Sequence, residues 1–150
     1  MKILKEQTVK ILILMFMLLN CGTFNVMART DTNVDYGRLI TAIGTVESKL
    51  NDKAVNGVYA GFLQISATMV TECNRINKIK KVSKRYTLHD RFNRQKSIEM
   101  FHIIQNFYNS SGDLHYAVLL WGEGCSAMKK PKRKTKYYHK VMKVYNNLKT

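Results

Sequence analysis

The sequence predicts an all-α domain, and three observations support this fold class. Apolar residues recur at helical spacing in several segments, whereas the alternation typical of strands is almost absent. Hydrophobic residues make up 45% of the 150 residues, which allows a packed core. One proline and eight glycines suggest helices joined by short loops. We expect five or six helices, with a short loop or strand insertion after the first.

The first helix is predicted over Asp35 to Leu50, with Asp35 as its N-cap. One apolar face at the i, i+3, i+4 spacing is formed by Leu39, Ile40, Ile43 and Val46. Glu47 lies in the last turn and borders this face. Burial and the negative end of the helix dipole both raise the pKa of a carboxyl group in such a place.

The remaining elements follow from caps, breaks and apolar spacing. A short extended piece is predicted within Val58 to Phe62, and Ser66 is a suitable N-cap for a helix that runs to about Ile79. The basic stretch Lys78 to Arg85 is predicted to be a loop. Three further helices are expected: Asp90 to Tyr108, Leu114 to Trp121 behind an Asp113 cap, and a last one carrying Tyr138, Val141, Met142 and Tyr145.

The amino-terminal residues have the pattern of a secretory signal peptide. Three lysines within the first ten residues precede an uninterrupted apolar run, Ile11 to Leu19. That run is too short to span a membrane, which takes about 20 residues. Val26-Met27-Ala28 offers small residues at the positions that a signal peptidase reads, so we expect cleavage after Ala28. We expect residues 1–28 to be removed and residues 29–150 to form the domain; an uncleaved anchor is the alternative.

A second processing route also fits this leader. The stretch from Leu18 to Gly22 is similar to a bacterial lipobox in which Cys21 is lipidated, although Asn20 stands where a small residue is usual. Soluble export and lipid anchoring therefore both stay open. Either route predicts an exported protein that is periplasmic, associated with the cell envelope or secreted.

Two cysteines remain outside the leader. Cys73 and Cys125 form an even pair, which in an oxidising compartment predicts a disulfide worth about 3–4 kcal/mol. The alternative is two ordinary buried thiols.

Positive charge dominates the composition. Lys and Arg number 25 against 10 Asp and Glu, so the net charge is +15, and loss of the leader leaves about +13. Such a charge favours anionic partners and says little about the fold. Its densest run is Lys129 to Lys136, which is expected to face an anionic envelope surface or simply to be a solvated loop. The export signal argues against nucleic acid as the partner.

Four motifs in order then resemble one enzyme family. Glu47-Ser48, followed by Gly61-Phe62-Leu63-Gln64, resembles the E-S and G-L-M-Q signature of the lytic transglycosylases, the SLT domains of the lysozyme-like superfamily. The stretch Ala117 to Gly124 looks like that family's apolar helix ending in A-Y-N-A-G, and Thr135 to Val141 looks like its late E-T-R-x-Y-V segment. The segment Arg91 to Tyr108 is similar to the helix between them.

The resemblance implies a lysozyme-like fold and a peptidoglycan substrate. In that family one Glu, here Glu47, protonates the glycosidic oxygen between N-acetylmuramic acid and N-acetylglucosamine. The same Glu then takes the proton of the C6 hydroxyl, and a 1,6-anhydro product forms without water. One carboxyl group that acts as acid and then as base is best served by a pKa raised towards neutrality. Small members of the family often serve secretion or conjugation machines, so such an apparatus is an expected partner.

The resemblance also supplies candidate substrate-binding residues, and four of them have a structural alternative. These residues are Ser48, Tyr59, Leu63, Gln64, Trp121 and Tyr138. Gln64 would bond to a sugar or else satisfy the loop backbone, and Leu63 would line the cleft or else pack in the core. Tyr138 holds the position of the family tyrosine whose hydroxyl lies near the acid, and Tyr59 would stack on a sugar ring or simply pack.

Departures from the family pattern keep further functions open. Gly122 stands where the family has Asn, and Lys134 stands where it has its late Glu. Glu123 is a candidate second carboxylate, which would allow hydrolysis by a true lysozyme, or an exposed Glu beside Lys129. The sequence is also compatible with a catalytically inactive peptidoglycan-binding module and with an exported binder of DNA or anionic lipid.

No metal or other cofactor is expected from the sequence. The four histidines are scattered and make no metal-ligand spacing, and the cysteine spacing is not a zinc pattern.

Overall fold

The structure is a computed structural model, and it describes residues 34–124, 126–130 and 132–148. The predicted signal peptide and the lipidation site at Cys21 lie outside the described residues, so both routes stay predictions. Residues Thr32–Thr150 form a compact unit of their own. Among the described residues, no helix has the length and apolar character needed to cross a membrane.

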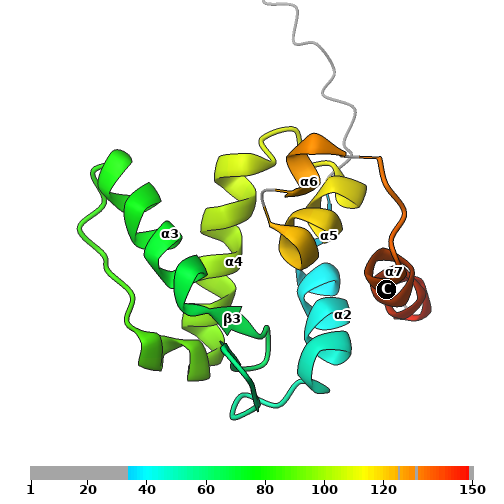
Figure 1. Ribbon diagram of the computed structural model, residues 1–150, viewed down its shortest axis with the longest axis horizontal. Helices are drawn as coiled ribbons and strands as arrows, with labels where there is room; N and C mark the ends of the chain where they lie inside the picture. Colours follow the sequence, from blue (N-terminus) through cyan, green and yellow to red (C-terminus); the bar gives the residue numbers. More distant parts are fainter. Residues whose placement is uncertain (1–33, 125, 131, 149–150) are drawn as a thin grey trace, which may run out of the picture. The chain divides into compact units, whose positions relative to one another are not determined.

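The described part is mostly helical, which confirms the predicted helical character (Figure 1). In chain order its elements are α2 (Tyr36–Ser48), β1 (Val55–Asn56), β2 (Tyr59–Ala60), β3 (Ile65–Ser66), α3 (Ala67–Ile79), the 3-10 helix η1 (Leu88–Phe92), α4 (Arg94–Tyr108), α5 (Leu114–Glu123), α6 (Ser126–Lys129) and α7 (Lys136–Asn147). The strands form an antiparallel sheet in the order β1-β2-β3. This sheet is the insertion predicted after the first helix.

Side-chain caps set the helix starts. Asp35, Ser66 and Asp113 each accept a backbone N–H from three residues further on, as predicted. The helix predicted over residues 90–108 is instead divided, because Asn93 accepts the N–H of Lys96 and starts α4 anew after η1. The sequence signal for this division is Asn93, which is suited to cap a helix although it stands within an apolar pattern.

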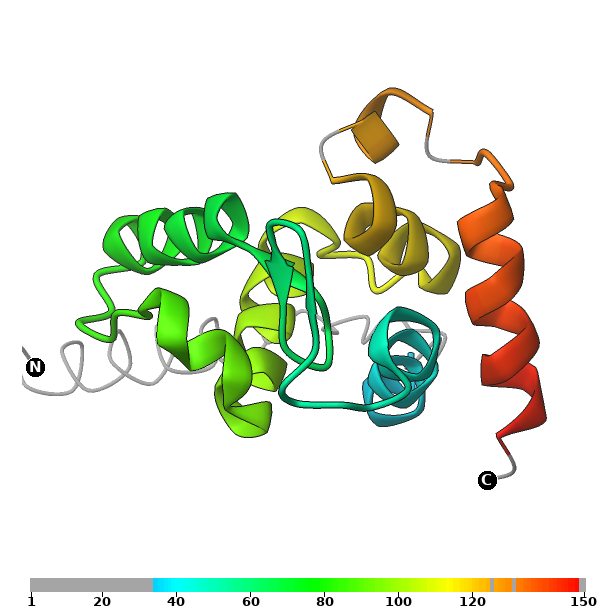
Figure 2. The ribbon, with the colours of Figure 1, turned by 60° about the horizontal axis from the view of Figure 1, so that its bottom comes forward.

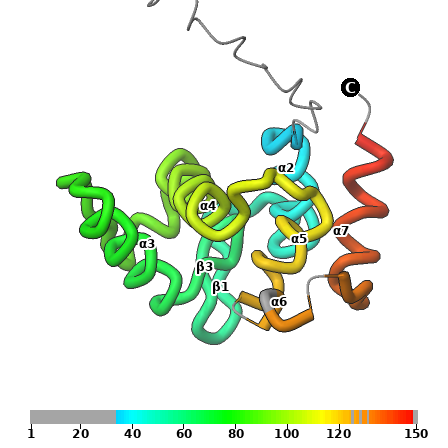
Figure 3. The backbone as a smooth tube through the Cα atoms, turned by 90° about the horizontal axis from the view of Figure 1, so that it is seen from above, coloured from blue at the N-terminus to red at the C-terminus, as the bar shows by residue number. Residues whose placement is uncertain are grey.

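The helices lie in a row across this unit. Figures 1 and 3 show α3 at one end and α7 at the other, with α4, α5 and α2 between them. Figure 2 shows α7 running beside α2, against which it packs. Buried side chains of the core include Leu39, Ile43, Phe62, Leu63, Phe101, Trp121 and Val141. The core therefore contains residues of the first described helix, of the loop-rich insertion and of the last described helix.

Arg38 ties α2 to the far end of α7. Its Nε donates to the Tyr145 carbonyl at 2.8 Å, and its guanidinium lies 4.4 Å from the centroid of the Tyr145 ring. A cation–π contact combined with a hydrogen bond holds the two helices in register.

Candidate active site

Glu47 and Tyr137 meet where α2 ends and α7 begins. The Tyr137 hydroxyl donates a hydrogen bond to Oε1 of Glu47 at 2.7 Å, although the two residues are 90 positions apart. Thr135 caps α7 and so places Tyr137 in its first turn. The Glu47 side chain is half-buried. The packing of α7 against α2 thus brings a phenol to a carboxyl group at the edge of the core.

Two opposing effects set the pKa of Glu47. Burial is the larger effect and raises the pKa of this carboxyl above its ordinary value, while the hydrogen bond from Tyr137 lowers it. Burial, reinforced by the neighbouring carboxylate, raises the pKa of the Tyr137 hydroxyl well above its usual range. Tyr137 therefore stays a hydrogen-bond donor, and Glu47 is a carboxyl group that can both give and take a proton.

The tyrosine beside the acid is Tyr137, whereas the family motif indicates Tyr138. The Tyr138 ring lies 4.1 Å from the His115 ring, centroid to centroid, and its backbone N–H bonds to Thr135. The helical spacing of the sequence indicates Tyr137 as the inward-facing tyrosine. Tyr137 stands four residues before the buried Val141, so the two side chains share the inner face of α7.

Gly122 makes room for the Tyr137 ring. A Cβ atom at position 122 would lie 2.3 Å from Cδ1 of Tyr137, so a larger residue could not stand there without moving the ring. The glycine at this position therefore leaves room for the tyrosine that bonds to Glu47.

Polar groups of the insertion hold the loop beside Glu47. The Ser48 hydroxyl donates to the Phe62 carbonyl at 2.8 Å and accepts the N–H of Asn51 at 3.1 Å. Gln64 has φ +51°, and its Nε2 donates to the Gly61 carbonyl at 2.8 Å. Both side chains are thus bonded to loop backbone, which for Gln64 is the structural alternative that the sequence left open.

Leu63 and Trp121 are both buried. For Leu63 this is the core-packing alternative that the sequence left open, and for Trp121 it differs from the expected contact with substrate. Leu63 is 0% exposed and Trp121 is 7% exposed. The indole N–H of Trp121 donates to the Leu63 carbonyl at 3.2 Å, and its ring lies 4.9 Å from that of Phe101. Both side chains are therefore part of the core. Tyr59, by contrast, is 48% exposed on β2 and stays available to a ligand.

The candidate second carboxylate, Glu123, and the acid next along the chain from Glu47, Asp52, are each paired with an arginine. Glu123 forms an ion pair with Arg133 rather than with the expected Lys129, and Asp52 lies 3.0 Å from Arg94. Each of these carboxylates is therefore engaged by an arginine side chain.

Two further predictions concern metal binding and the cysteine thiols. Within the part of the chain that the structure describes, no group of His, Cys, Asp and Glu is suited to hold a metal ion. Cys73 is buried, and its Sγ lies 3.7 Å from the Met100 carbonyl oxygen. Its predicted disulfide partner, Cys125, lies outside the described residues, so the pairing stays a prediction.

The basic side chains described between Lys129 and Lys136 are exposed, and Arg133 among them pairs with Glu123.

No protein-family model, no curated protein and no solved structure matches this chain.

Proposed function

We propose that this chain is a peptidoglycan lytic transglycosylase of lysozyme-like fold, with Glu47 as general acid and base. The supporting observation is the half-buried carboxyl of Glu47, whose pKa is raised by burial while the Tyr137 hydroxyl donates to its Oε1. That combination suits an acid that must be protonated at the start of a reaction and ionised in the middle of it.

The reaction then needs one carboxyl group. Protonated Glu47 gives its proton to the glycosidic oxygen as the bond to N-acetylmuramic acid breaks, and the substrate's own acetamido group stabilises the cationic sugar. Ionised Glu47, held by Tyr137, takes the proton of the C6 hydroxyl. That hydroxyl oxygen closes on C1, so a 1,6-anhydro end forms and Glu47 is again protonated.

The pairing of other acids favours this route over hydrolysis. A hydrolytic glycosidase usually needs a second carboxylate as a base or nucleophile. Glu123 and Asp52 are each occupied by an arginine. In this proposal the mature chain acts in the cell envelope, on glycan strands alone or beside a secretion or conjugation apparatus.

The test is digestion of peptidoglycan sacculi by residues 29–150, followed by mass analysis of the released muropeptides. We expect products with 1,6-anhydro ends, and Glu47→Gln should slow their release about 10²- to 10⁴-fold because the acid and base are lost together. Glu72→Gln is the matched control, since Glu72 pairs with Arg75 on α3. Products one water heavier would indicate a lysozyme, and binding without release by either form would indicate an inactive binding module.

A further inference from the structure

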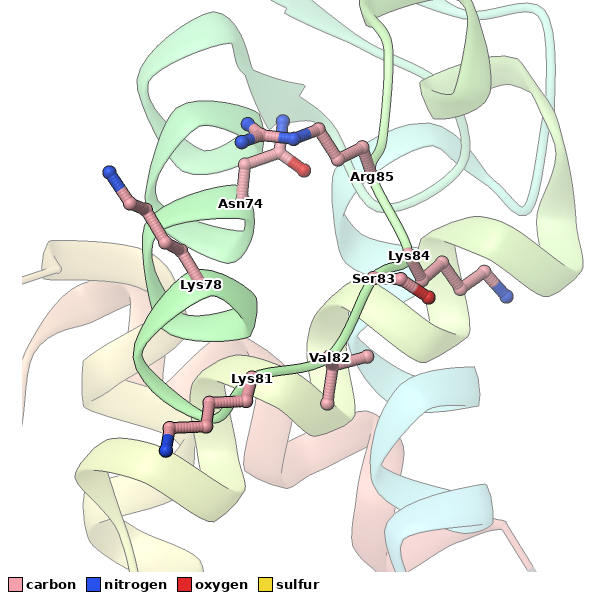
Figure 4. A pocket seen from close by; sticks show the side chains of 7 residues that line it. All are labelled: Asn74, Lys78, Lys81, Val82, Ser83, Lys84 and Arg85. Carbon is pink, nitrogen blue, oxygen red and sulfur yellow. The ribbon is translucent and has the colours of Figure 1, made fainter.

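A basic pocket opens between the end of α3 and the segment that follows it. Its volume is about 260 Å³, and it is lined by Asn74, Lys78 and residues 81–85 (Figure 4). Lysine and arginine make up most of this lining, and no acid belongs to it. The helix α3 stands at the opposite end of the domain from α7, which carries Tyr137 (Figures 1 and 3). The pocket is thus separate from the proposed active site.

Two asparagines of α3 hold the wall of the pocket in place. Asn74 donates to the Tyr86 carbonyl and accepts the Tyr86 N–H, both at 2.8 Å. Asn77 donates to the Lys84 carbonyl at 2.8 Å. Because the backbone is anchored at these points, the wall of the pocket is in place before any ligand arrives, which lowers the ordering cost of binding.

Three of the pocket cations form no ion pair with any residue that the structure describes. Lys84 is neutralised, since its Nζ lies 2.6 Å from Glu99, and Figure 4 shows its side chain directed away from that of Lys78. No ion pair engages Lys78, Lys81 or Arg85 within the part of the chain that the structure describes. Figure 4 shows the Arg85 side chain beside Asn74, and it shows Lys78 and Lys81 extending outward from the rim of the hollow. Arginine and lysine side chains both bind the oxygens of a phosphate group.

Exposed apolar side chains beside the pocket indicate where that phosphate comes from. Ile79 is 56% exposed and Val82 is 48% exposed. A free phosphate ion or a soluble phosphate polymer gains nothing from these side chains. A membrane does, because basic residues contact its anionic headgroups while neighbouring apolar residues enter the acyl boundary.

We propose that residues 78–85 form a docking site for anionic lipid. In this site the pocket receives a headgroup phosphate, and Ile79 and Val82 enter the interfacial region of the bilayer. The inference does not depend on the glycan chemistry proposed for Glu47.

Co-sedimentation with vesicles of phosphatidylglycerol and phosphatidylcholine in equal parts tests the site, using residues 29–150. The variant combines Lys78→Gln with Lys81→Asn, since Lys81 has φ +55° and Asn tolerates that conformation. We expect vesicle binding to weaken about 25-fold, because each surface base contributes a factor of about five. The matched control, Lys140→Gln with Lys143→Gln on α7, should weaken it less than about 3-fold. Equal losses in both would overturn the site, because they would mean diffuse charge attraction.

A second variant separates a membrane from a soluble phosphate ligand. Ile79→Ser with Val82→Ser keeps every charge, and it should weaken binding to the vesicles while leaving binding of inorganic polyphosphate unchanged. Unchanged vesicle binding in this variant would overturn the membrane assignment and leave a site for soluble phosphate. All variants should keep their melting temperature and their cleavage of sacculi, so failure here is distinct from failure of the Glu47 proposal.

Discussion

The hydrogen bond from Tyr137 to Glu47 is one of two effects that set how readily this carboxyl group gains and loses a proton. Burial favours the protonated form, and the tyrosine hydroxyl favours the ionised one. Neither effect alone would suit a group that must pass a proton in both directions. The balance between them is therefore the property that mutation should disturb.

Tyr137→Phe should raise the pKa of Glu47 further, because it removes the hydrogen bond that lowers this pKa. The acid then stays protonated to higher pH, so the alkaline limb of the kcat/KM profile should move upward. Activity at the optimum should fall roughly 10-fold, as ionised Glu47 loses a charge-assisted hydrogen bond. Tyr138→Phe is the control and should leave the limb in place. If the alkaline limb of the kcat/KM profile moved only in the Tyr138→Phe variant, that result would contradict the assignment of Tyr137 as the residue that lowers the pKa of Glu47.

Gly122→Ala should displace the Tyr137 ring, since its Cβ atom would lie 2.3 Å from Cδ1. Alanine favours a helix over glycine by about 1 kcal/mol, but overpacking costs about 1–3 kcal/mol, so the net effect should be destabilising. Urea unfolding measures this change, and sacculus digestion should slow with it. In the control Gly37→Ala the nearest atom is Asp35 Oδ1 at 3.4 Å, and stability should hold or rise. Equal free energies of unfolding for Gly122→Ala and Gly37→Ala would show that the Tyr137 ring moves aside without cost.

At the scale of elements, the insertion after α2 depends on one close approach. A Cβ atom at Gly61 would lie 1.8 Å from the carbonyl oxygen of Arg91, and Gly61 has φ +77°. The backbone of the sheet loop and the backbone of η1 therefore touch at this residue. This contact explains why the Gly-Phe-Leu-Gln stretch begins with glycine.

Gly61→Ala should lower the free energy of unfolding by about 4 kcal/mol or more, because backbone cannot move aside as a side chain can. Gly57→Ala separates the two contributions, since Gly57 has φ +59° and open space around it. That control should cost only about 1–2 kcal/mol for the left-handed conformation. Urea unfolding of both variants gives the comparison, and similar losses would mean that the contact with η1 can relax.

At the scale of the whole molecule, the net charge of +15 governs how the protein meets anionic surfaces. Binding of the Glu47→Gln variant to sacculi should weaken roughly tenfold as NaCl rises from about 0.05 M to about 0.3 M, because salt screens exposed charges. Sedimentation of sacculi with the bound protein measures this, with circular dichroism as the check that the fold persists. Binding that is insensitive to salt would assign the affinity to uncharged contacts with the glycan.

The sequence by itself determined the helical class, most helix starts and the place of Glu47 in a last turn. Caps such as Asp35, Ser66 and Asp113 bond within three residues, so the order of residues along the chain is enough to predict them. The apolar spacing before Glu47 is equally local.

Only the tertiary structure decided which side chains meet. Tyr137 rather than Tyr138 reaches Glu47 because the register of α7 against α2 selects the inner face of the helix. Leu63 and Trp121 bond to each other and are lost to a ligand, while residues 81–85 curve around a basic pocket. These contacts join residues far apart in the chain, and their geometry depends on how the core packs as a whole rather than on any local pattern.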